Sequence, residues 1–561
     1  MDTFYTTYLA TLYGSERAAV LGARLQELLN RYRGRIPQPA HSSLSEHDAL
    51  LITYGDQIRE NDKPPLQTLA EFCESYLRGV VSGIHILPFY PWSSDDGFAV
   101  KEYRAVDAAL GDWSHIARLG QSFRLMFDGV INHVSAQCEW FQKFLRGEQP
   151  YCDYFITVED NADLSRVVRP RALPLLTEFA TASGKRKVWT TFSADQVDLN
   201  FKNPDVLFEI FDVLLGYAAR GAQFIRLDAI AYLWKEIGTP CIHLPQTHAI
   251  IQLLRAALDE VAPHVYLITE TNVPHQENIS YFGDGTNEAQ LVYNFALPPL
   301  TLHTFHREDA STLTQWAADL TLPSKQTTFF NFLASHDGIG LNPVRGILSS
   351  AEVDALIERT LAHGGLISYK HNADGSQSPY EMNINYFDAL SNPSSGESLN
   401  FQIDRFMAAQ AIMLSLIGLP GIYFHSLFGS RSWGEGVKIT KHNRTINRQK
   451  FMRSELEQEL ADPHSLRSRV FARYRQLLAA RSSSSAFHPH GTQKVLDVDK
   501  RIFAVLRISP DEAKQVLCLQ NVTTREIDIQ NPLKNASRNL LTNRAHESSL
   551  TLKPYETLWL E

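Results

Sequence analysis

The sequence predicts an α/β protein built on a (β/α)8 TIM barrel, with small inserted domains and a C-terminal antiparallel β domain. Eight short apolar runs rich in β-branched and aromatic residues recur along the chain, with helical stretches between them. Nearly continuous hydrophobic runs are typical of strands buried on both faces, and eight of them favour a closed parallel barrel over an open sheet. The runs begin at Leu50, Gly83, Arg124, Phe224, Val265, Gln290, Thr328 and Gly421.

The spacing between these runs is uneven and indicates insertions. Far more residues separate the third run from the fourth than one crossover helix needs, so we expect a small inserted domain there. After the seventh run, HNADGSQSPYEMN and SNPSSGES are typical of loops and predict a lid over the site. Past RSSSSAFHPHG the pattern changes to period-two alternation, as in RIFAVLRI and VLCLQNV, which predicts antiparallel strands.

The predicted domain boundaries follow these changes of pattern. The amphipathic stretch LGARLQELLNRYRGR precedes the first run and predicts a helical extension. The predicted division is 1–48 for this extension, 49–134, 203–338 and 392–480 for the barrel, 135–202 for the domain inserted after the third strand, 339–391 for the lid region after the seventh, and 485–561 for the C-terminal β domain.

Charge and composition exclude several classes of partner. The chain has 53 Lys and Arg against 62 Asp and Glu, a net charge of -9, which is the wrong sign for binding nucleic acid or anionic lipid. Its five cysteines are scattered and form no CxxC pair, so neither a disulfide framework nor a thiolate metal site is indicated. His488 and His490 have no further ligand nearby and are more typical of a linker than of a metal site. We expect no metal and no organic cofactor.

The ends and the apolar segments of the sequence predict a cytoplasmic protein without a membrane span. The N-terminal segment lacks a basic region followed by a continuous apolar region, so it is not typical of a secretory signal. Residues 406–430 carry no charge and would be long enough to cross a bilayer. Gly418, Pro420 and Gly421 interrupt them, however, which favours a buried helix followed by a buried strand.

Three of the apolar runs end in carboxylates, where a barrel of this kind carries its active site. Asp228 ends the fourth run, and Arg226 lies two residues earlier on the same face, where it should hold the carboxylate ionised. Glu270 ends the fifth run on an otherwise apolar strand, so we expect burial to raise its pKa toward that of a general acid. Asp337 follows the seventh run. Each alone is equally typical of an ion pair or a loop anchor, but three at the ends of three strands predict a catalytic site.

Such a set of carboxylates is suited to glycoside chemistry. Two carboxyl groups about 5 Å apart across a glycosidic bond give a retaining mechanism, in which one is the nucleophile and the other the acid and then the base. The third can bind sugar hydroxyls. The third run adds Asp128, which can organise the site, and His133, which can donate a hydrogen bond to a sugar. A histidine in this position is otherwise more often satisfied structurally.

The segments DGVINH, FIRLDAI, ITETN and LASHD resemble the four ordered motifs of the α-amylase clan of retaining α-glucoside enzymes. Further segments, among them HILPFYPWSSDDGF, RPRALP, NFALPPLTLH and RTINR, are similar to the sucrose phosphorylase branch of that clan, and the likeness extends from Leu50 to Arg448. Within the branch, the N-terminal extension, ETNVPH and SHDGIGLNPVRG resemble the glucosylglycerate phosphorylases.

The resemblance implies roles for the residues on the donor side of the site. Asp228 would be the nucleophile, Glu270 the acid/base and Asp337 the stabiliser of the transition state. Substrate binding is implied for Asp95, Phe98, His133, Arg226, His336 and Arg444, with Asp95 and Arg444 closing the far edge of the sugar site. The aromatic pair Phe89 and Phe98 is equally compatible with packing.

On the acceptor side the resemblance is partial. Arg171, Tyr232 and Tyr380 match positions that receive phosphate in sucrose phosphorylases. Glu381 stands where those enzymes have Gln and would repel phosphate unless paired or turned away. Asn272 stands where they have His, and both changes argue for an acceptor other than fructose. The anionic acceptor should meet a cation, for which the candidates are Arg171, Lys235 and Arg345, the last being equally typical of an ordinary surface loop.

These inferences together predict a retaining glucosyl phosphorylase. It would convert 2-O-α-glucosylglycerate and phosphate to α-glucose 1-phosphate and glycerate through a covalent intermediate, with no partner beyond these small molecules. The alternatives are a sucrose, sucrose 6'-phosphate or glucosylglycerol phosphorylase on the same fold, a plain hydrolase, and a catalytically inactive amylase-like scaffold. The retained carboxylates and the lack of a membrane anchor argue against the last.

Overall fold

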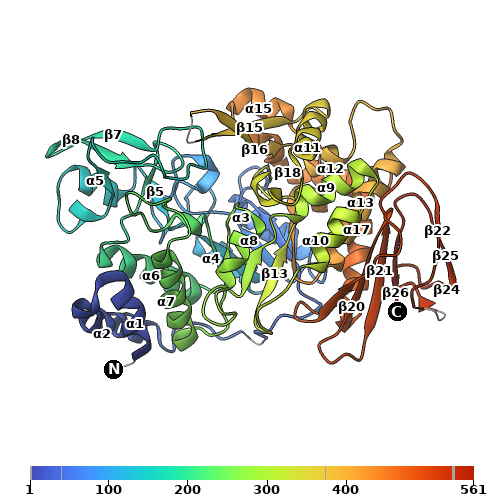
Figure 1. Cartoon of the computed structure of the whole chain (residues 1–561), viewed down its shortest axis with the longest axis horizontal. Helices are drawn as coiled ribbons and strands as arrows, with labels where there is room; N and C mark the ends of the chain where they lie inside the picture. Colours follow the sequence, from blue (N-terminus) through green and yellow to red (C-terminus); the bar gives the residue numbers. More distant parts are fainter. Residues whose placement is uncertain (1–2, 40, 373–374, 534–536) are drawn as a thin grey trace.

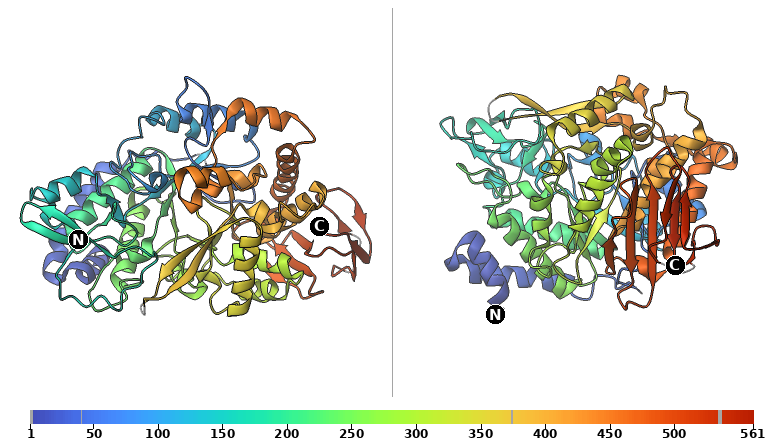
Figure 2. Two further views of the ribbon diagram at one scale, coloured as in Figure 1. Left: turned by 90° about the horizontal axis from the view of Figure 1, so that it is seen from above. Right: turned by 45° about the vertical axis from the view of Figure 1, so that its right-hand side comes forward.

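A computed structural model describes residues 3–39, 41–372, 375–533 and 537–561 of the chain. The N-terminal helices and the C-terminal β domain lie at opposite ends of its long axis, with the barrel between them (Figures 1 and 2). The barrel strands are β1 (Leu50–Thr53), β3 (Gly83–Ile86), β4 (Arg124–Gly129), β10 (Ala222–Leu227), β11 (Tyr266–Thr269), β12 (Leu291–Tyr293), β13 (Thr328–Asn331) and β17 (Leu419–Tyr423). All pair in parallel, and β1 closes the barrel by pairing with both β3 and β17. The predicted fold class is confirmed.

Helices follow the strands and bury the outer face of the barrel. They include α3 (Pro65–Tyr76), α4 (Trp113–Gly120), α6 (Pro204–Ala219), α7 (Pro245–Val261), α9 (Leu297–Arg307), α13 (Leu399–Ser415) and α17 (Leu466–Ser482). α6 shows how the sequence starts such a helix: Asn203 accepts a hydrogen bond from the Asp205 N–H at 2.9 Å, and Pro204 takes the first helical position. Its apolar residues then face the barrel.

The uncharged stretch 406–430 is buried within the barrel. It comprises most of α13, then β17, and then the short helix α14 (Phe424–Leu427). The predicted strand GIYFHSL is therefore correct only as far as Tyr423. In the part of the chain that the structure describes, no helix has the length and apolar character needed to cross a membrane.

Two insertions lie at the carboxyl ends of the barrel strands. The first, after β4, carries β5 (His133–Ser135), α5 (Glu139–Leu145), β6 (Thr157–Val158), β7 (Leu176–Thr181), β8 (Gly184–Trp189) and β9 (Gln196–Asp198). The second, after β13, carries β14 (Ile339–Gly340), α11 (Ser350–Ala362), β15 (Leu366–His371) and β16 (Gln377–Asn383).

The loop predicted over HNADGSQSPYEMN is wrong for most of its length. Residues 373–374 of it lie outside the described residues, but Gln377–Asn383 form β16, which pairs with both β14 and β15. Its polar side chains Tyr380, Glu381 and Asn383 are buried. The segment is polar because these side chains belong to a site inside the protein. Its polarity therefore did not indicate exposure to solvent.

The terminal segments pack against the barrel. α1 (Thr3–Tyr13) and α2 (Ser15–Tyr32) lie beside α6 and α7, and Tyr32 donates a hydrogen bond to Asp212 of α6 at 2.8 Å. The C-terminal domain pairs β19 (Thr492–Val495), β20 (Ile502–Ile508), β21 (Gln515–Asn521) and β26 (Thr557–Leu560) into one antiparallel sheet. Alternate residues of β21 face two cores: Cys518 faces the barrel, whereas Leu517 and Leu519 face β22 (Ile527–Gln530) and β25 (Ser549–Leu552).

Candidate active site

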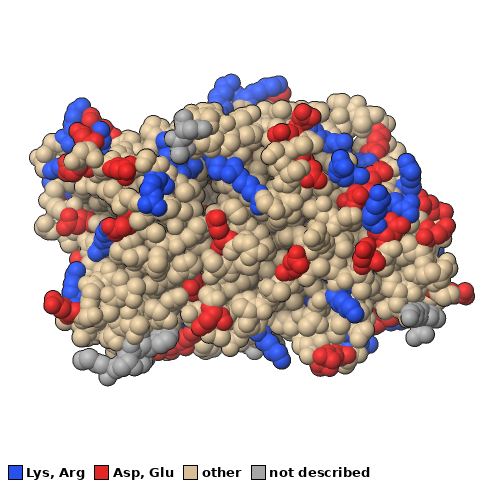
Figure 3. All heavy atoms as spheres, viewed as in Figure 1, with Lys and Arg blue, Asp and Glu red and all other residues tan. Residues whose placement is uncertain are grey.

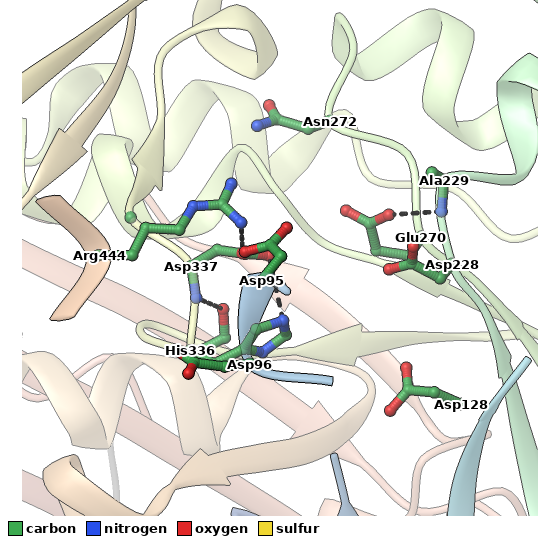
Figure 4. A network of polar contacts seen from close by, with 12 residues as sticks. Asp95, Asp96, Asp128, Asp228, Ala229, Glu270, Asn272, His336, Asp337 and Arg444 are labelled. Carbon is green, nitrogen blue, oxygen red and sulfur yellow. Dashed lines mark hydrogen bonds and ion pairs between the residues drawn. The ribbon is translucent and has the colours of Figure 1, made fainter. Parts of the chain in front are cut away.

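The three predicted carboxylates line one cavity at the carboxyl end of the barrel. Asp228 follows β10, Glu270 follows β11, and Asp337 comes shortly after β13. Asp228 and Glu270 lie side by side on one wall, and Asp337 and Arg444 lie opposite them (Figure 4). The cavity is lined by Asp95, Phe98, His133, Arg171, Phe192, Gln196, Asp228, Ala229, Ala231, Tyr232, Glu270, Thr271, Asn272, Val273, His336, Asp337, Tyr380 and Arg444.

Arg226 lies beneath the cavity and is shared between two carboxylates. Its Nη1 donates to Oδ1 of Asp228 at 2.8 Å and also to Asp128, which in turn contacts His85 Nε2 at 2.7 Å. Arg226 is 1% exposed and is not part of the cavity wall. Its position therefore supports orientation of Asp228, and the structure gives it no route to a bound sugar.

The charge state expected for Asp228 needs correction. Burial raises the pKa of Asp228 well above its usual value, Arg226 opposes this, and the negative charges of Glu270 and Asp128 add to it. The pKa of Asp128 is lowered despite its burial, because His85 and Arg226 both contact it. The charge of Arg226, which also contacts Asp128, therefore does not offset the effect of burial on the pKa of Asp228.

Glu270 has the environment predicted for it. Its Oε2 accepts a hydrogen bond at 2.9 Å from the N–H of Ala229. Ala229 has a φ of 49°, which residues other than glycine rarely adopt. Burial raises the pKa of Glu270, and the charge of Asp337 adds to the shift, whereas Arg226 lowers it. The titrations of Asp228 and Glu270 are therefore linked, and their apparent pKa values describe the pair rather than either residue alone.

Asp337 is held by Arg444, which also holds Glu381. Arg444 contacts Asp337 through Nη1, and its Nε and Nη2 donate to the two carboxylate oxygens of Glu381 at 3.0 and 2.7 Å. Arg444 and Arg448 lower the pKa of Asp337 against the effect of its burial. Glu381 is 1% exposed and does not line the cavity, and its charge is paired with Arg444.

The arginine that reaches Asp95 is Arg448. Asp95 and Arg444 both line the cavity, but Arg448 Nη1 lies 3.8 Å from Asp95 and donates to Asp96 at 2.6 Å. Its Nε donates to the carbonyl of His336 at 2.8 Å. The sequence placed Asp95 and Arg444 at the far edge of the sugar site, and the structure brings both to this cavity. Arg448, from the same segment RTINR, lies 3.8 Å from Asp95 and 3.9 Å from Asp337.

Two neutral histidines and one aromatic ring complete the donor wall. The rings of Phe98 and His336 stack with centroids 4.7 Å apart. His133 lies 2.9 Å from the carbonyl of Phe98 through Nε2 and 3.2 Å from Gln196. Burial lowers the pKa of both histidines, so each is neutral at pH 7 and carries one N–H. That of His133 is on Nε2 and donates to the Phe98 carbonyl, while Asn132 Nδ2 lies 3.2 Å from Nδ1.

Lys235 is bonded to the residues behind His133 and does not lie on the side predicted for the acceptor. It donates to Asn132 Oδ1 at 2.7 Å and pairs with Asp198 at 2.5 Å, and Asn132 in turn contacts His133. Lys235 is 6% exposed and absent from the cavity wall, so the structure does not bring it to the acceptor. Lys235 comes three residues after the cavity-lining Tyr232, and nothing in the sequence there indicated this burial.

Arg171, Tyr232, Asn272 and Tyr380, which the sequence assigned to the acceptor side, all line this cavity. Asn272 donates to the hydroxyl of Tyr380 at 3.2 Å. Phe192 and Gln196, from the first insertion, were not predicted; Phe192 packs edge-on against Tyr232 with centroids 5.6 Å apart. Figure 3 shows the molecule hollowed on this face between the first insertion and β15, with Lys and Arg side chains at the rim.

Two further candidates lie elsewhere. Arg345 is exposed and borders a separate cavity with His275 and Trp316. It follows β14 on a turn that leads away from the carboxylates, so the structure does not bring it to the predicted acceptor site. Phe89 is fully buried and packs against Tyr90 and other rings, as the packing alternative predicted.

Comparison with known proteins agrees with this geometry. Residues 75–339 match the alpha amylase catalytic domain family. The chain is 51% identical to the glucosylglycerate phosphorylase of Spirochaeta thermophila, over 98% of this chain and 97% of that protein. It is 52% identical to that of Allomeiothermus silvanus, over 99% of this chain and 97% of that protein. The chain belongs to the glucosylglycerate phosphorylase family of the α-amylase clan.

A solved structure from the same clan lies further away. The crystal structure of sucrose 6F-phosphate phosphorylase from Thermoanaerobacter thermosaccharolyticum covers 92% of this chain and 100% of its own, with a TM-score of 0.75 and 25% identity. The glucosylglycerate phosphorylase family is therefore much more similar in sequence than this member of the sucrose branch. The resemblance inferred from the motifs is confirmed.

Proposed function

We propose that this protein is a retaining glucosyl phosphorylase that converts 2-O-α-glucosylglycerate and phosphate to α-glucose 1-phosphate and glycerate. The observation that carries the proposal is the coincidence of two findings. About half of all residues are identical to glucosylglycerate phosphorylases over nearly the whole chain, and Asp228 and Glu270 lie side by side at adjacent strand ends. The reaction belongs to the glycosyl-transferring phosphorylases.

In the proposed mechanism Asp228 attacks the anomeric carbon while Glu270 protonates the leaving oxygen of glycerate. This needs an ionised Asp228 and a protonated Glu270. Arg226 lies 2.8 Å from Asp228 but 3.9 Å from Glu270, so its charge favours that distribution of the proton. Glu270 Oε2 accepts from Ala229, which leaves Oε1 to carry the proton.

In the second half of the reaction phosphate attacks the β-linked glucosyl enzyme, and Glu270 accepts its proton. Two inversions at the anomeric carbon give the α-product. Asp337, kept ionised by Arg444 and Arg448, would hold sugar hydroxyls and stabilise the positive charge that develops on the anomeric carbon and ring oxygen in the transition state. His133, His336, Asp95 and Phe98 would enclose the glucosyl unit, and Arg171, Tyr232, Asn272 and Tyr380 the phosphate and the glycerate.

A substrate panel tests the proposal. Glucosylglycerate, sucrose, sucrose 6'-phosphate and glucosylglycerol are each incubated with the enzyme, with and without phosphate, and α-glucose 1-phosphate and free glucose are measured. We expect glucose 1-phosphate from glucosylglycerate in the presence of phosphate. A preference for another glucoside would show that the acceptor is not glycerate. Release of free glucose at the same rate without phosphate would show that the protein is a hydrolase. The cytoplasmic location stays a prediction.

A further inference from the structure

A second cavity lies outside the catalytic one, and the proposed mechanism does not use it. Its volume is about 410 Å³, and its walls come from α8 (His275–Asn278), from α10 (Ser311–Ala318) and the segment after it, and from the turn after the short helix η5 (Asn342–Val344) (Figure 1). It shares no lining residue with the catalytic cavity. Binding sites for small molecules usually measure about 300–1,000 Å³, so this cavity has room for one small ligand.

The most deeply buried part of its lining is aromatic. Trp316 is 5% exposed, and its ring meets that of His275 edge to face with centroids 5.9 Å apart. Burial lowers the pKa of His275 to about 4, so this ring is neutral at pH 7. Trp316 Nε1 and His275 Nδ1 are buried and have no hydrogen-bond partner within the part of the chain that the structure describes. Buried polar atoms normally have partners, so these two mark a wall with hydrogen-bonding capacity that the chain leaves unused.

Helix α10 adds hydroxyl, amide and carboxylate groups to the same wall. Thr312, Gln315 and Asp319 are three and then four residues apart, so the helix and its last residue present them on one face. None of these side chains forms a hydrogen bond or ion pair with a residue in the described ranges. Such groups donate to and accept from hydroxyls, which suits a ligand with several hydroxyl groups.

The turn after η5 brings a positive charge to the cavity. Arg345 lines it and is exposed. Lys370 of β15 lies near Arg345, since burial and then the charge of Arg345 lower the pKa of Lys370 to about 8. Neither cation is paired with an acidic residue among those that the structure describes. Two neighbouring cations without a counter-charge repel each other and attract an anion.

We propose that this cavity is a second, non-catalytic binding site for a sugar-sized hydroxylated anion. Arg345 pairs with the carboxylate or phosphate of the ligand, the polar groups of α10 bind its hydroxyls, and the ring of Trp316 packs against its carbon skeleton. The proposal does not depend on the proposed function, because no residue of this cavity takes part in the mechanism. A hollow that holds only solvent predicts that no such anion binds here.

The experiment is isothermal titration calorimetry of the full chain without a glucosyl donor. The probes are glucuronate, which carries a carboxylate, glucose 6-phosphate, which carries a phosphate, and neutral glucose. Titrations are made on the wild type and on Arg171→Ala, which removes a cation from the catalytic cavity and so reduces anion binding there. In both proteins we expect at least one of the two anions to bind with a Kd below about 1 mM, and glucose to bind about tenfold more weakly or not at all. The anion that binds identifies the negative group.

Variants of the second cavity locate the binding. In the Arg171→Ala background, Arg345→Ala should weaken the anion roughly 10- to 150-fold and Gln315→Ala about threefold. The control is Arg35→Ala, which removes an exposed arginine of the N-terminal extension that likewise has no partner among the described residues, and it should change the Kd by less than about twofold. Arg345, Gln315 and Arg35 are all exposed, so we expect these variants to fold.

Three results would overturn the proposal. The first is that neither anion binds to the wild type. The second is that binding is lost in Arg171→Ala but kept in Arg345→Ala, which would assign it to the catalytic cavity. The third is equal weakening by Arg345→Ala and Arg35→Ala, which would show a general effect of charge and no site. A wild type that prefers an acceptor other than glycerate would refute the proposed function and would leave these titrations as they are.

Discussion

The donor and acceptor sides of the cavity are built in different ways. Donor residues such as Asp228 and Glu270 follow barrel strands directly and are tied to one another through Arg226 and backbone donors. Acceptor residues come from insertions and loops: Arg171 from the first insertion, Tyr380 from β16 and Asn272 from a loop. Loops vary more readily than strand ends, so the chemistry of the clan is held by the barrel and the choice of acceptor by its additions.

The largest effect should come from the donor side. Asp228→Asn removes the nucleophile while keeping its shape, so we expect phosphorolysis and glucose 1-phosphate/phosphate exchange to fall about 10⁴-fold or more. Initial rates of glucose 1-phosphate release measure this, and the melting temperature checks that the fold is intact. A variant that kept a tenth of the wild-type turnover would remove Asp228 from this role.

Glu270→Gln should give a loss that depends on the leaving group. With glucosylglycerate, whose leaving oxygen needs a proton, we expect a loss of about 10²–10⁴-fold. With α-glucosyl fluoride the first step needs little protonation and should be much less affected. Rates with the two donors on the same preparation give an internal control. Equal losses with both would show that Glu270 is not the acid.

The same contrast explains what could be predicted from sequence. Strands buried on both faces leave continuous apolar runs, and a carboxylate at the end of such a run is conspicuous, so Asp228, Glu270 and Asp337 were found together with the barrel. On the acceptor side the signal is weaker because the deciding feature is direction. Nothing near Lys235 or Arg345, both proposed for the acceptor, shows that Lys235 is buried and bonded to Asn132 or that Arg345 is exposed.

A smaller effect should separate the two arginines that the sequence proposed for the acceptor. Arg171 lines the cavity, so Arg171→Ala should weaken phosphate and glycerate by about 1.5–3 kcal/mol, roughly 10- to 150-fold, while neutral glycerol changes little. Arg345→Ala is the matched control, since Arg345 borders another cavity, and should stay within about twofold. Reverse-reaction KM values for glycerate and glycerol decide between them. If only Arg345→Ala raised the KM for glycerate, the acceptor site would have to be assigned to the loop of Arg345 instead.

The smallest effect should appear in stability and should have the opposite sign to the loss of activity. Burial raises the folded-state pKa of Glu270 above its unfolded value, so its contribution to stability is present below the unfolded value, near pH 4, and is lost as the pH rises through the folded value. Glu270→Gln keeps a neutral group at every pH.

We therefore expect the melting temperatures of the Glu270→Gln variant and the wild type to be similar near pH 4. Above pH 7 that of the variant should be higher, by about 1 °C for each kcal/mol regained. Thermal unfolding across this range measures the difference. The control is Glu397→Gln, which removes a carboxylate paired with Arg405 away from the cavity. A variant that is less stable than the wild type at pH 8 would mean that the Ala229 N–H and the Arg226 charge outweigh the cost of burying the carboxylate.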